Sequence, residues 1–143
     1  MTALLDVNVL IALIDPFHSH NDRAHDWFAR NAASGWASCP LTENGAIRVF
    51  GHSRYPLGPG SPAAAAQLMA GLFAHEAREF WPEDFSLLSD PNVDCGRLGS
   101  ASQVTDTYLL ALALRRGGKL ATFDRRLSGI AVTGGSEALS LID

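Results

Sequence analysis

Four carboxylates occupy matching places along this sequence. Asp6 follows the apolar residues 3–5, and Asp124 ends the apolar stretch 120–123. Glu43 and Asp106 stand in the first turns of two predicted helices. In an open parallel sheet, strand ends and helix starts of this kind meet at the carboxyl edge of the strands. We therefore expect the four acids to lie close together, where they would repel one another unless cations neutralised them.

Hard divalent cations suit such a cluster, because Mg²⁺ and Mn²⁺ prefer carboxylate oxygens as ligands. One or two ions would bind phosphate oxygens and lower the pKa of an attacking water, which predicts metal-assisted hydrolysis of a phosphodiester bond. Asp6 and Asp106 are predicted to be direct ligands, and Glu43 and Asp124 to complete the shell directly or through water. Each acid also has a purely structural interpretation, with Asp6 as a helix N-cap and Asp106 as an ordinary first-turn acid.

Two polar residues are expected to support the carboxylates. Asn8 stands two residues after Asp6, and Thr122 stands two residues before Asp124. Side chains two residues apart on an extended segment face the same way, so Thr122 and Asp124 should point together. Both Asn8 and Thr122 are predicted to orient carboxylates or waters.

Three arginines are candidates for contact with a phosphate. Arg48 lies roughly one helical turn beyond Glu43, and Arg125 and Arg126 directly follow Asp124. Ten of the eleven basic residues are arginines, whose guanidinium group binds phosphate through two hydrogen bonds. An equally good interpretation is that these three are solvated surface residues.

Histidines and a flexible loop complete the candidate site. The spacing of His18, His20 and His25 matches no usual zinc pair, so we interpret them as surface histidines or as rim residues that contact a substrate. Residues 52–62 are rich in glycine and proline and predict an exposed loop. Its 52–60 part is the best candidate for a flexible segment beside the acids.

Composition limits the possibilities further. The chain of 143 residues is long enough for one domain with a full core, and we expect a single domain over residues 1–143. The formal charge of −4 argues against a broadly basic surface for nucleic acids. It does not exclude a nucleic-acid enzyme, because bound Mg²⁺ reverses the sign of an acidic site locally.

The location of the protein is predicted from what its segments lack. The first residues reach Asp6 and Asn8 too early for the apolar core of a signal peptide, and no apolar run approaches transmembrane length. Cys39 and Cys95 show no CxxC spacing, which favours two reduced thiols, although the sequence leaves a disulfide open. We expect a cytoplasmic protein without a membrane partner.

Hydrophobic periodicity predicts a chain of alternating strands and helices. Thr105 is expected to cap the helix that carries Asp106, Thr42 to cap the helix that carries Glu43, and Gly117-Gly118 to end the former. The order of elements indicates an α/β fold with a mostly parallel sheet of about five strands and helices on both faces. The predicted strands are 2–5, 35–40, 78–82, 119–124 and 139–142, and the predicted helices follow residues 6, 22, 40, 61 and 105.

Four segments, taken together and in this order, carry a family resemblance over nearly the whole chain. They are Leu4–Leu13, Thr42–Ile47, Gln103–Ala113 and Leu120–Asp124. The sequence resembles the PIN-domain ribonucleases and, within them, the toxin component of VapBC toxin–antitoxin modules. Residues 96–102 and the 52–60 loop match no motif of the family.

The resemblance implies a fold, an activity and a set of residues. The fold implied is the PIN fold, a Rossmann-like parallel sheet, and the activity implied is Mg²⁺- or Mn²⁺-dependent cleavage of RNA. The acidic quartet of the family falls on Asp6, Glu43, Asp106 and Asp124. Its polar residue after the first acid falls on Asn8, and its hydroxyl before the last acid falls on Thr122.

The resemblance also implies partners. Proteins of this family usually form homodimers and are silenced by a small antitoxin that inserts a segment into the active-site groove. An arginine of the antitoxin often reaches the acids, and an acidic cleft would attract an arginine even without metal.

Two other functions stay open at the level of sequence. A phosphatase of the HAD-like kind also uses Mg²⁺ and strand-end aspartates, but it needs a second carboxylate two residues after the first, where this chain has Asn8. The other alternative is a catalytically inactive PIN domain that only binds a partner, and the presence of all four acids argues against it.

Overall fold

The computed structural model describes residues 1–143 and contains one five-stranded sheet. Every neighbouring pair of strands is parallel, and the strand order is β3-β2-β1-β4-β5. The predicted α/β fold with a parallel sheet is therefore confirmed. The strands are β1 (Ala3–Leu5), β2 (Trp36–Ser38), β3 (Arg78–Phe80), β4 (Lys119–Thr122) and β5 (Leu139–Leu141).

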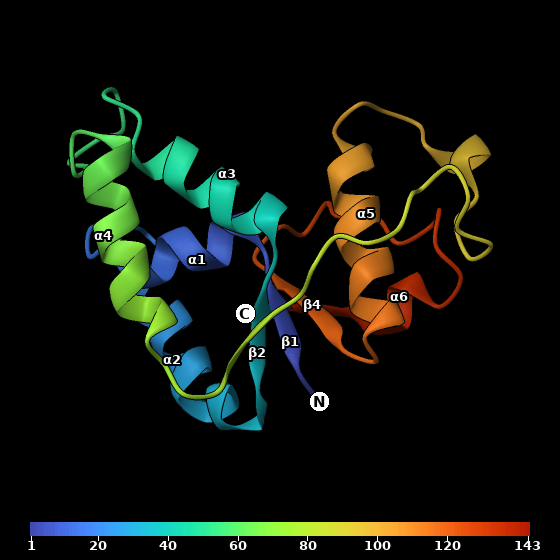
Figure 1. The fold of residues 1–143 in the computed structure, drawn as a ribbon, viewed down its shortest axis with the longest axis horizontal. Coiled ribbons are helices and arrows are strands. Elements are labelled where there is room, and N and C mark those ends of the chain that lie inside the picture. The colour runs from blue at the N-terminus through green and yellow to red at the C-terminus, as the bar shows by residue number, and fades with distance from the viewer.

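Helices cover both faces of the sheet (Figure 1). One face carries α1 (Val7–Ile14), α2 (Asn21–Asn31), α3 (Pro40–Phe50) and α4 (Pro62–Phe73). The other carries α5 (Gln103–Arg115) and the short α6 (Gly135–Ala138). Two 3₁₀ helices, η1 (Ala32–Ser34) and η2 (Cys95–Arg97), lie in the connections. None of the helices combines the length and the apolar character needed to cross a membrane.

Alternate residues of the inner strands β1 and β4 pack into two separate cores. In β1, Leu5 belongs to the core beneath α1 to α4, whereas Leu4 belongs to the core beneath α5. In β4, Ala121 belongs to the core beneath α1 to α4, and Leu120 belongs to the core beneath α5. Because both faces are covered, the strands read as continuous apolar runs instead of alternating ones.

Two predicted helix caps are wrong by a few residues. The N-cap of α3 is Cys39, and Thr42 is the third helical residue, whose Oγ1 accepts a hydrogen bond from the Cys39 N–H at 3.1 Å. Thr42 thus acts from inside the helix, as the reciprocal partner in a capping box does. Helix α5 begins at Gln103, before Thr105, and the Gln103 side chain accepts a hydrogen bond from the Gly99 N–H at 2.6 Å.

The predicted glycine end of α5 is confirmed. Gly117 has a φ of 67°, a left-handed conformation that glycine adopts without a steric penalty. The Gly118 N–H donates to the Ala113 carbonyl at 2.8 Å, which closes the helix with a Schellman motif. The turn leads directly into β4, where the Lys119 N–H donates to the Thr2 carbonyl at 3.0 Å.

The strand order creates one special place at the carboxyl edge. β1 pairs with both β2 and β4, so the chain first moves outward through β2 to β3 and then returns to the other side of β1. At such a point of reversal the connections leave the sheet in opposite directions and open a crevice outside the carboxyl ends of the strands. Here the ends of β1 and β4 lie at that point of reversal.

Candidate functional site

Asp6 is held at the point of reversal by its main chain and by its side chain. Its N–H donates to the Ala121 carbonyl of β4 at 3.0 Å. Its Oδ1 caps α1 by accepting a hydrogen bond from the Val7 N–H at 2.7 Å, as the structural interpretation expected. The residue is only 8% exposed, and its second oxygen, Oδ2, faces other partners.

Thr122 and Asn8 occupy the space around that second oxygen. The Thr122 hydroxyl donates to Asp6 Oδ2 at 2.8 Å, and Asn8 Nδ2 donates to Thr122 Oγ1 at 3.1 Å. Asn8 Oδ1 accepts a hydrogen bond from the Phe123 N–H at 3.1 Å, and Thr122 Oγ1 accepts one from the Asp124 N–H at 3.1 Å. The network ties the start of α1 to the end of β4 and holds the Asp6 carboxylate in one orientation.

Three aspartates influence one another electrostatically at this place. Burial, together with repulsion from Asp6 and Asp124, raises the pKa of Asp106 from 3.8 to about 6. Burial also raises the pKa of Asp6, with a smaller contribution from Asp124, while hydrogen bonds from Thr122 and Val7 oppose the shift. The structure therefore brings Asp6, Asp106 and Asp124 together, as the sequence predicted.

Glu43 lies at the end of the strand next to β1 and has an anchor of its own. It lies in the first turn of α3, at the carboxyl end of β2, which is the neighbour of β1. The hydroxyl of Ser38, the last residue of β2, donates to Glu43 Oε2 at 2.6 Å. No hydrogen bond joins Glu43 to the three aspartates. Sequence reasoning missed Ser38, although a hydroxyl in a buried apolar strand needs a partner and could have drawn attention to it.

The donor set suits a hard divalent cation in its chemistry. The acids are oxygen donors, and neither Asp6 nor Asp106 forms an ion pair with a lysine or arginine. No three Asp, Glu, His or Cys side chains surround one point at which an ion could be held as they stand. Binding would therefore require rotation of the partly exposed Asp106 and Asp124, or bridging water.

The three candidate arginines lie in different surroundings. Arg126 contacts Asp124 with both its side chain and its main chain. Its side-chain Nε is 3.8 Å from Asp124 Oδ1, and its main-chain N–H donates to the same oxygen at 2.9 Å. Its side chain is 96% exposed and free to move. Arg125 instead pairs with Asp143 at 3.4 Å, near the end of the chain.

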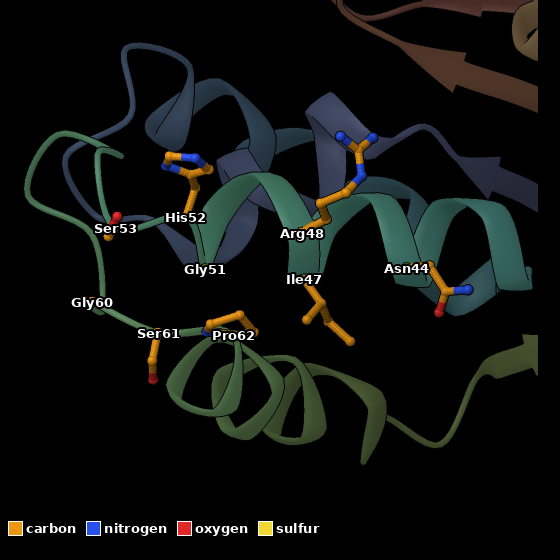
Figure 2. A pocket seen from close by; sticks show the side chains of 9 residues that line it. All are labelled: Asn44, Ile47, Arg48, Gly51, His52, Ser53, Gly60, Ser61 and Pro62. Atoms are coloured by element: carbon orange, nitrogen blue, oxygen red, sulfur yellow. The ribbon is translucent and has the colours of Figure 1, made fainter.

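Arg48 borders a hollow of about 700 Å³ at the junction of α3 and α4. Figure 2 shows Ile47 pointing toward α4, whereas the Arg48 side chain extends from α3 on the side away from α4. None of the four acids lines this hollow, which also includes His52 and Ser53 from the predicted loop. Contact between Arg48 and a phosphate stays a prediction.

Two of the three histidines lie near Phe123, the residue that precedes Asp124 in the chain. The His20 ring stacks on Phe123, the residue before Asp124, with ring centroids 4.6 Å apart and planes inclined by 22°. The His18 ring lies 5.5 Å from that of His20. His25 turns away, with its Nε2 2.9 Å from the Leu13 carbonyl. His20 thus packs on the residue before Asp124 and His25 lies elsewhere, whereas contact of the histidines with a substrate stays a prediction.

The free cysteines take no part in this arrangement. Cys39 is buried at the start of α3, and Cys95 is exposed in η2. Burial raises the pKa of the Cys39 thiol. Both are free cysteines in the structure, and their reduced state stays a prediction.

Comparison with known proteins agrees with this geometry. The PIN domain pattern matches residues 3–132. Ribonuclease VapC44 of Mycobacterium tuberculosis is 44% identical over 137 residues, which cover 96% of each chain. Ribonuclease VapC39 of the same organism is 40% identical over 139 residues, or 97% of this chain and 100% of the relative. Ribonuclease VapC38 is 43% identical over 122 residues, or 85% of this chain and 84% of the relative.

The match spans all the elements that hold the candidate acids, from β1 to the residues after β4. The relatives are covered almost from end to end. The chain therefore belongs to the PIN-domain family and, within it, to the group that contains the VapC ribonucleases.

Proposed function

We propose that this chain is a divalent-metal-dependent endoribonuclease and the toxin of a toxin–antitoxin pair, built as one PIN domain over residues 1–143. The observation that carries the proposal is the grouping of Asp6, Asp106 and Asp124, where burial and, to a smaller extent, repulsion between carboxylates raise the pKa of Asp6 and of Asp106. Such mutual repulsion persists in a folded protein where a bound cation relieves it. The ribonuclease names of the relatives support the same activity.

Asp6, Asp106 and Asp124, together with Glu43, would hold Mg²⁺ or Mn²⁺. The bound cation supplies neutralisation of the phosphate charge and a lower pKa for the attacking water. The hydroxyl of Thr122 fixes Asp6 Oδ2 at 2.8 Å, and the hydroxyl of Ser38 fixes Glu43 Oε2 at 2.6 Å. These donors keep the carboxylates oriented before substrate arrives, so little reorganisation is needed during the reaction.

The arrangement around Asn8 argues against the phosphatase alternative. That chemistry needs an acid two residues after Asp6. The amide of Asn8 instead donates to Thr122 Oγ1 at 3.1 Å and accepts from the Phe123 N–H at 3.1 Å. Both ends of the amide are used to hold the site together, so Asn8 acts as a support and cannot serve as a general acid.

Partners follow from the same charges. The acid group at the carboxyl edge would attract an arginine of a cognate antitoxin in the absence of metal. For the homodimer we expect apolar surface on α4 to contribute, because Leu68 is 47% exposed there. The substrate is RNA, and the proposed reaction takes place where Arg126 and Asp124 lie together.

The test is cleavage of total cellular RNA by the purified chain with Mg²⁺, with Mn²⁺ and with chelator, alongside Asp106→Asn. Loss of an outer-shell residue typically costs about 10–100-fold in activity, so we expect the loss of Asp106 to cost at least about a hundredfold. The substitution keeps the shape of the side chain, so the melting temperature should not fall. Equal cutting by Asp106→Asn, or cutting that persists in chelator, would falsify the assignment.

A further inference from the structure

A second group of side chains includes the residue before Asp124 and makes no hydrogen bond to the acids. It consists of His18, His20, Arg23 and Phe123, which we call the aromatic–basic cluster. Phe123 links it to the acids, because this residue immediately precedes Asp124 and its N–H donates to Asn8 Oδ1 at 3.1 Å. The other three members come from the loop before α2 and its first turn.

The cluster combines stacked rings with a cation. The His20 and Phe123 rings are nearly parallel, with centroids 4.6 Å apart. The guanidinium carbon of Arg23 lies 5.7 Å from the centre of the Phe123 ring, and its Nη2 contacts His20 Nδ1. Burial, with the charges of Arg23 and His18, lowers the pKa of His20, which favours a neutral ring at pH 7. Neutral imidazole is a stacking surface, and guanidinium is a phosphate ligand.

Arg23 is also free of the ion pairs that occupy other arginines. No carboxylate lies within ion-pair distance of Arg23. Its charge is therefore available to an incoming anion. The arginines engaged in ion pairs are Arg97, Arg115, Arg116, Arg125 and Arg126.

RNA has a particular need for such a group here. A polyanion that approaches Asp6, Asp106 and Asp124 meets like charge, so a cation beside the acids must offset part of the repulsion. Single-stranded RNA is bound through bases that stack on aromatic side chains and through phosphates that contact arginine. The chemistry of the cluster therefore favours a nucleotide.

We propose that the aromatic–basic cluster is a subsite for the nucleotide next to the cleaved bond of a single-stranded RNA, with Arg23 binding a phosphate and the His20 ring stacking on the base. The proposal rests on the proposed ribonuclease function and adds to it the residues that position the substrate. Phe123 supports the His20 ring from behind and sets its distance from Asp124.

Binding of fluorescent single-stranded RNA 12-mers of random sequence tests the subsite. The full chain carries Asp106→Asn in every case, so that the RNA stays intact. We expect Arg23→Gln to weaken binding about tenfold and to lower the slope of log affinity against log salt by about one. His20→Ala should weaken binding at least about fivefold. Arg23→Lys, which keeps the charge, should recover most of the affinity.

The matched control is Arg30→Gln, which removes the same charge from an exposed position in the last turn of the same helix. It should bind RNA within about twofold of the parent. Melting temperatures of all variants show whether a loss reflects unfolding. Equal affinities of Arg23→Gln and Arg30→Gln overturn the subsite, and so does a parent that does not bind RNA.

Cleavage by chains that keep Asp106 separates this proposal from the one on which it rests. Metal-dependent cutting by wild type, with cut ends that His20→Ala leaves unchanged, overturns the subsite and leaves the ribonuclease standing. A wild-type chain that does not cut, while Arg23→Gln selectively loses RNA binding, supports the subsite and overturns the ribonuclease. Cut ends that become less selective in His20→Ala support both.

Discussion

The two edges of the sheet are built in opposite ways. At the amino edge, main-chain groups close the structure: the Ala3 N–H donates to the Gly35 carbonyl at 3.2 Å, and the Lys119 N–H donates to the Thr2 carbonyl at 3.0 Å. At the carboxyl edge the main chain is paired as well, by the Asp6 N–H for example, but acidic side chains also meet there. Asp6 and Asp106 have raised pKa values because burial and like charge disfavour their ionised forms.

The difference between the two edges shows which part of the fold is stabilising and which part lowers the stability of the free protein. Main-chain hydrogen bonds and tight packing at the amino edge stabilise the strands whatever is bound. The crowded acids at the carboxyl edge destabilise the free protein at neutral pH, and a structure retains such a feature where it serves a function. Substitutions at the amino edge should therefore affect folding, and substitutions at the carboxyl edge should affect activity, metal response or pH dependence.

Apart from the loss of cleavage, the largest expected effect is the stabilisation of the folded protein by added metal ions. Saturating Mn²⁺ at about 100 times its Kd should stabilise the wild-type chain by about 2.7 kcal/mol, because the ion binds the carboxylates only when they are brought together. For a chain of this size that raises Tm by roughly 8 °C. Thermal unfolding of Asp106→Asn should show a much smaller rise, while Asp26→Asn, an exposed aspartate of α2, should respond like wild type. If Mn²⁺ left the Tm of wild type unchanged, the proposal that the acids bind a divalent cation would be wrong.

The amino edge should respond to Gly118→Ala with a loss of stability. A Cβ on Gly118 would lie 2.4 Å from the Thr2 carbonyl oxygen and 2.8 Å from the Trp81 ring. Overpacking of this kind costs about 1–3 kcal/mol of unfolding free energy, measurable by urea denaturation. Cleavage per folded molecule should be unchanged.

Gly71→Ala is the control for that substitution, because nothing lies within 4 Å of a Cβ at this position in α4. Alanine should be neutral there or stabilise the helix by roughly 0.5–1 kcal/mol. If Gly118→Ala were as stable as Gly71→Ala, the amino edge would be less tightly packed than the structure indicates.

Ser38→Ala sharpens the comparison from the carboxyl edge. It removes the hydroxyl that holds Glu43 Oε2 at 2.6 Å, and loss of an outer-shell hydrogen bond typically costs about tenfold in activity or metal affinity. Initial cleavage rates over a range of Mn²⁺ concentrations would show the effect. Ser53→Ala, at an exposed serine of the hollow beside α3, should cleave like wild type. If Ser38→Ala and Ser53→Ala both cleave like wild type, Ser38 does not anchor Glu43.

The smallest effect should appear in the pH dependence of stability in chelator. The pKa of Asp106 is raised from 3.8 to about 6, so the folded state holds its proton more tightly than the unfolded state does. The contribution of Asp106 to stability is complete below about pH 4 and is lost as pH rises to about 6. Because the side chain is partly exposed, the loss should be no more than about 1 kcal/mol.

Asp106→Asn lacks this titration, so its stability relative to wild type should increase between pH 4 and pH 6 and stay level above pH 7. Urea denaturation of both proteins at several pH values measures the difference. A difference that does not vary with pH would show that Asp106 is not crowded by Asp6 and Asp124 in the free protein.

Local patterns predicted local features well. The Ser61-Pro62 start of α4 and the Gly117-Gly118 end of α5 are where the sequence placed them, because capping depends on neighbouring residues only. Helix α6 was missed, since its four residues are too few to show a period. Leu68 of α4 is 47% exposed although it is apolar, because which face of a helix is covered depends on its neighbours in space.

The sequence by itself determined which side chains are acids, that each follows an apolar segment, and which family the motifs resemble. Only the tertiary structure decided that β1 lies beside β4, which lets Thr122 hydrogen-bond to Asp6 over 116 residues of chain. It also decided that Ser38 anchors Glu43 and that His20 stacks on Phe123. The physical reason is that strand order and crossover direction result from the burial of whole faces, and no short stretch of sequence encodes that choice.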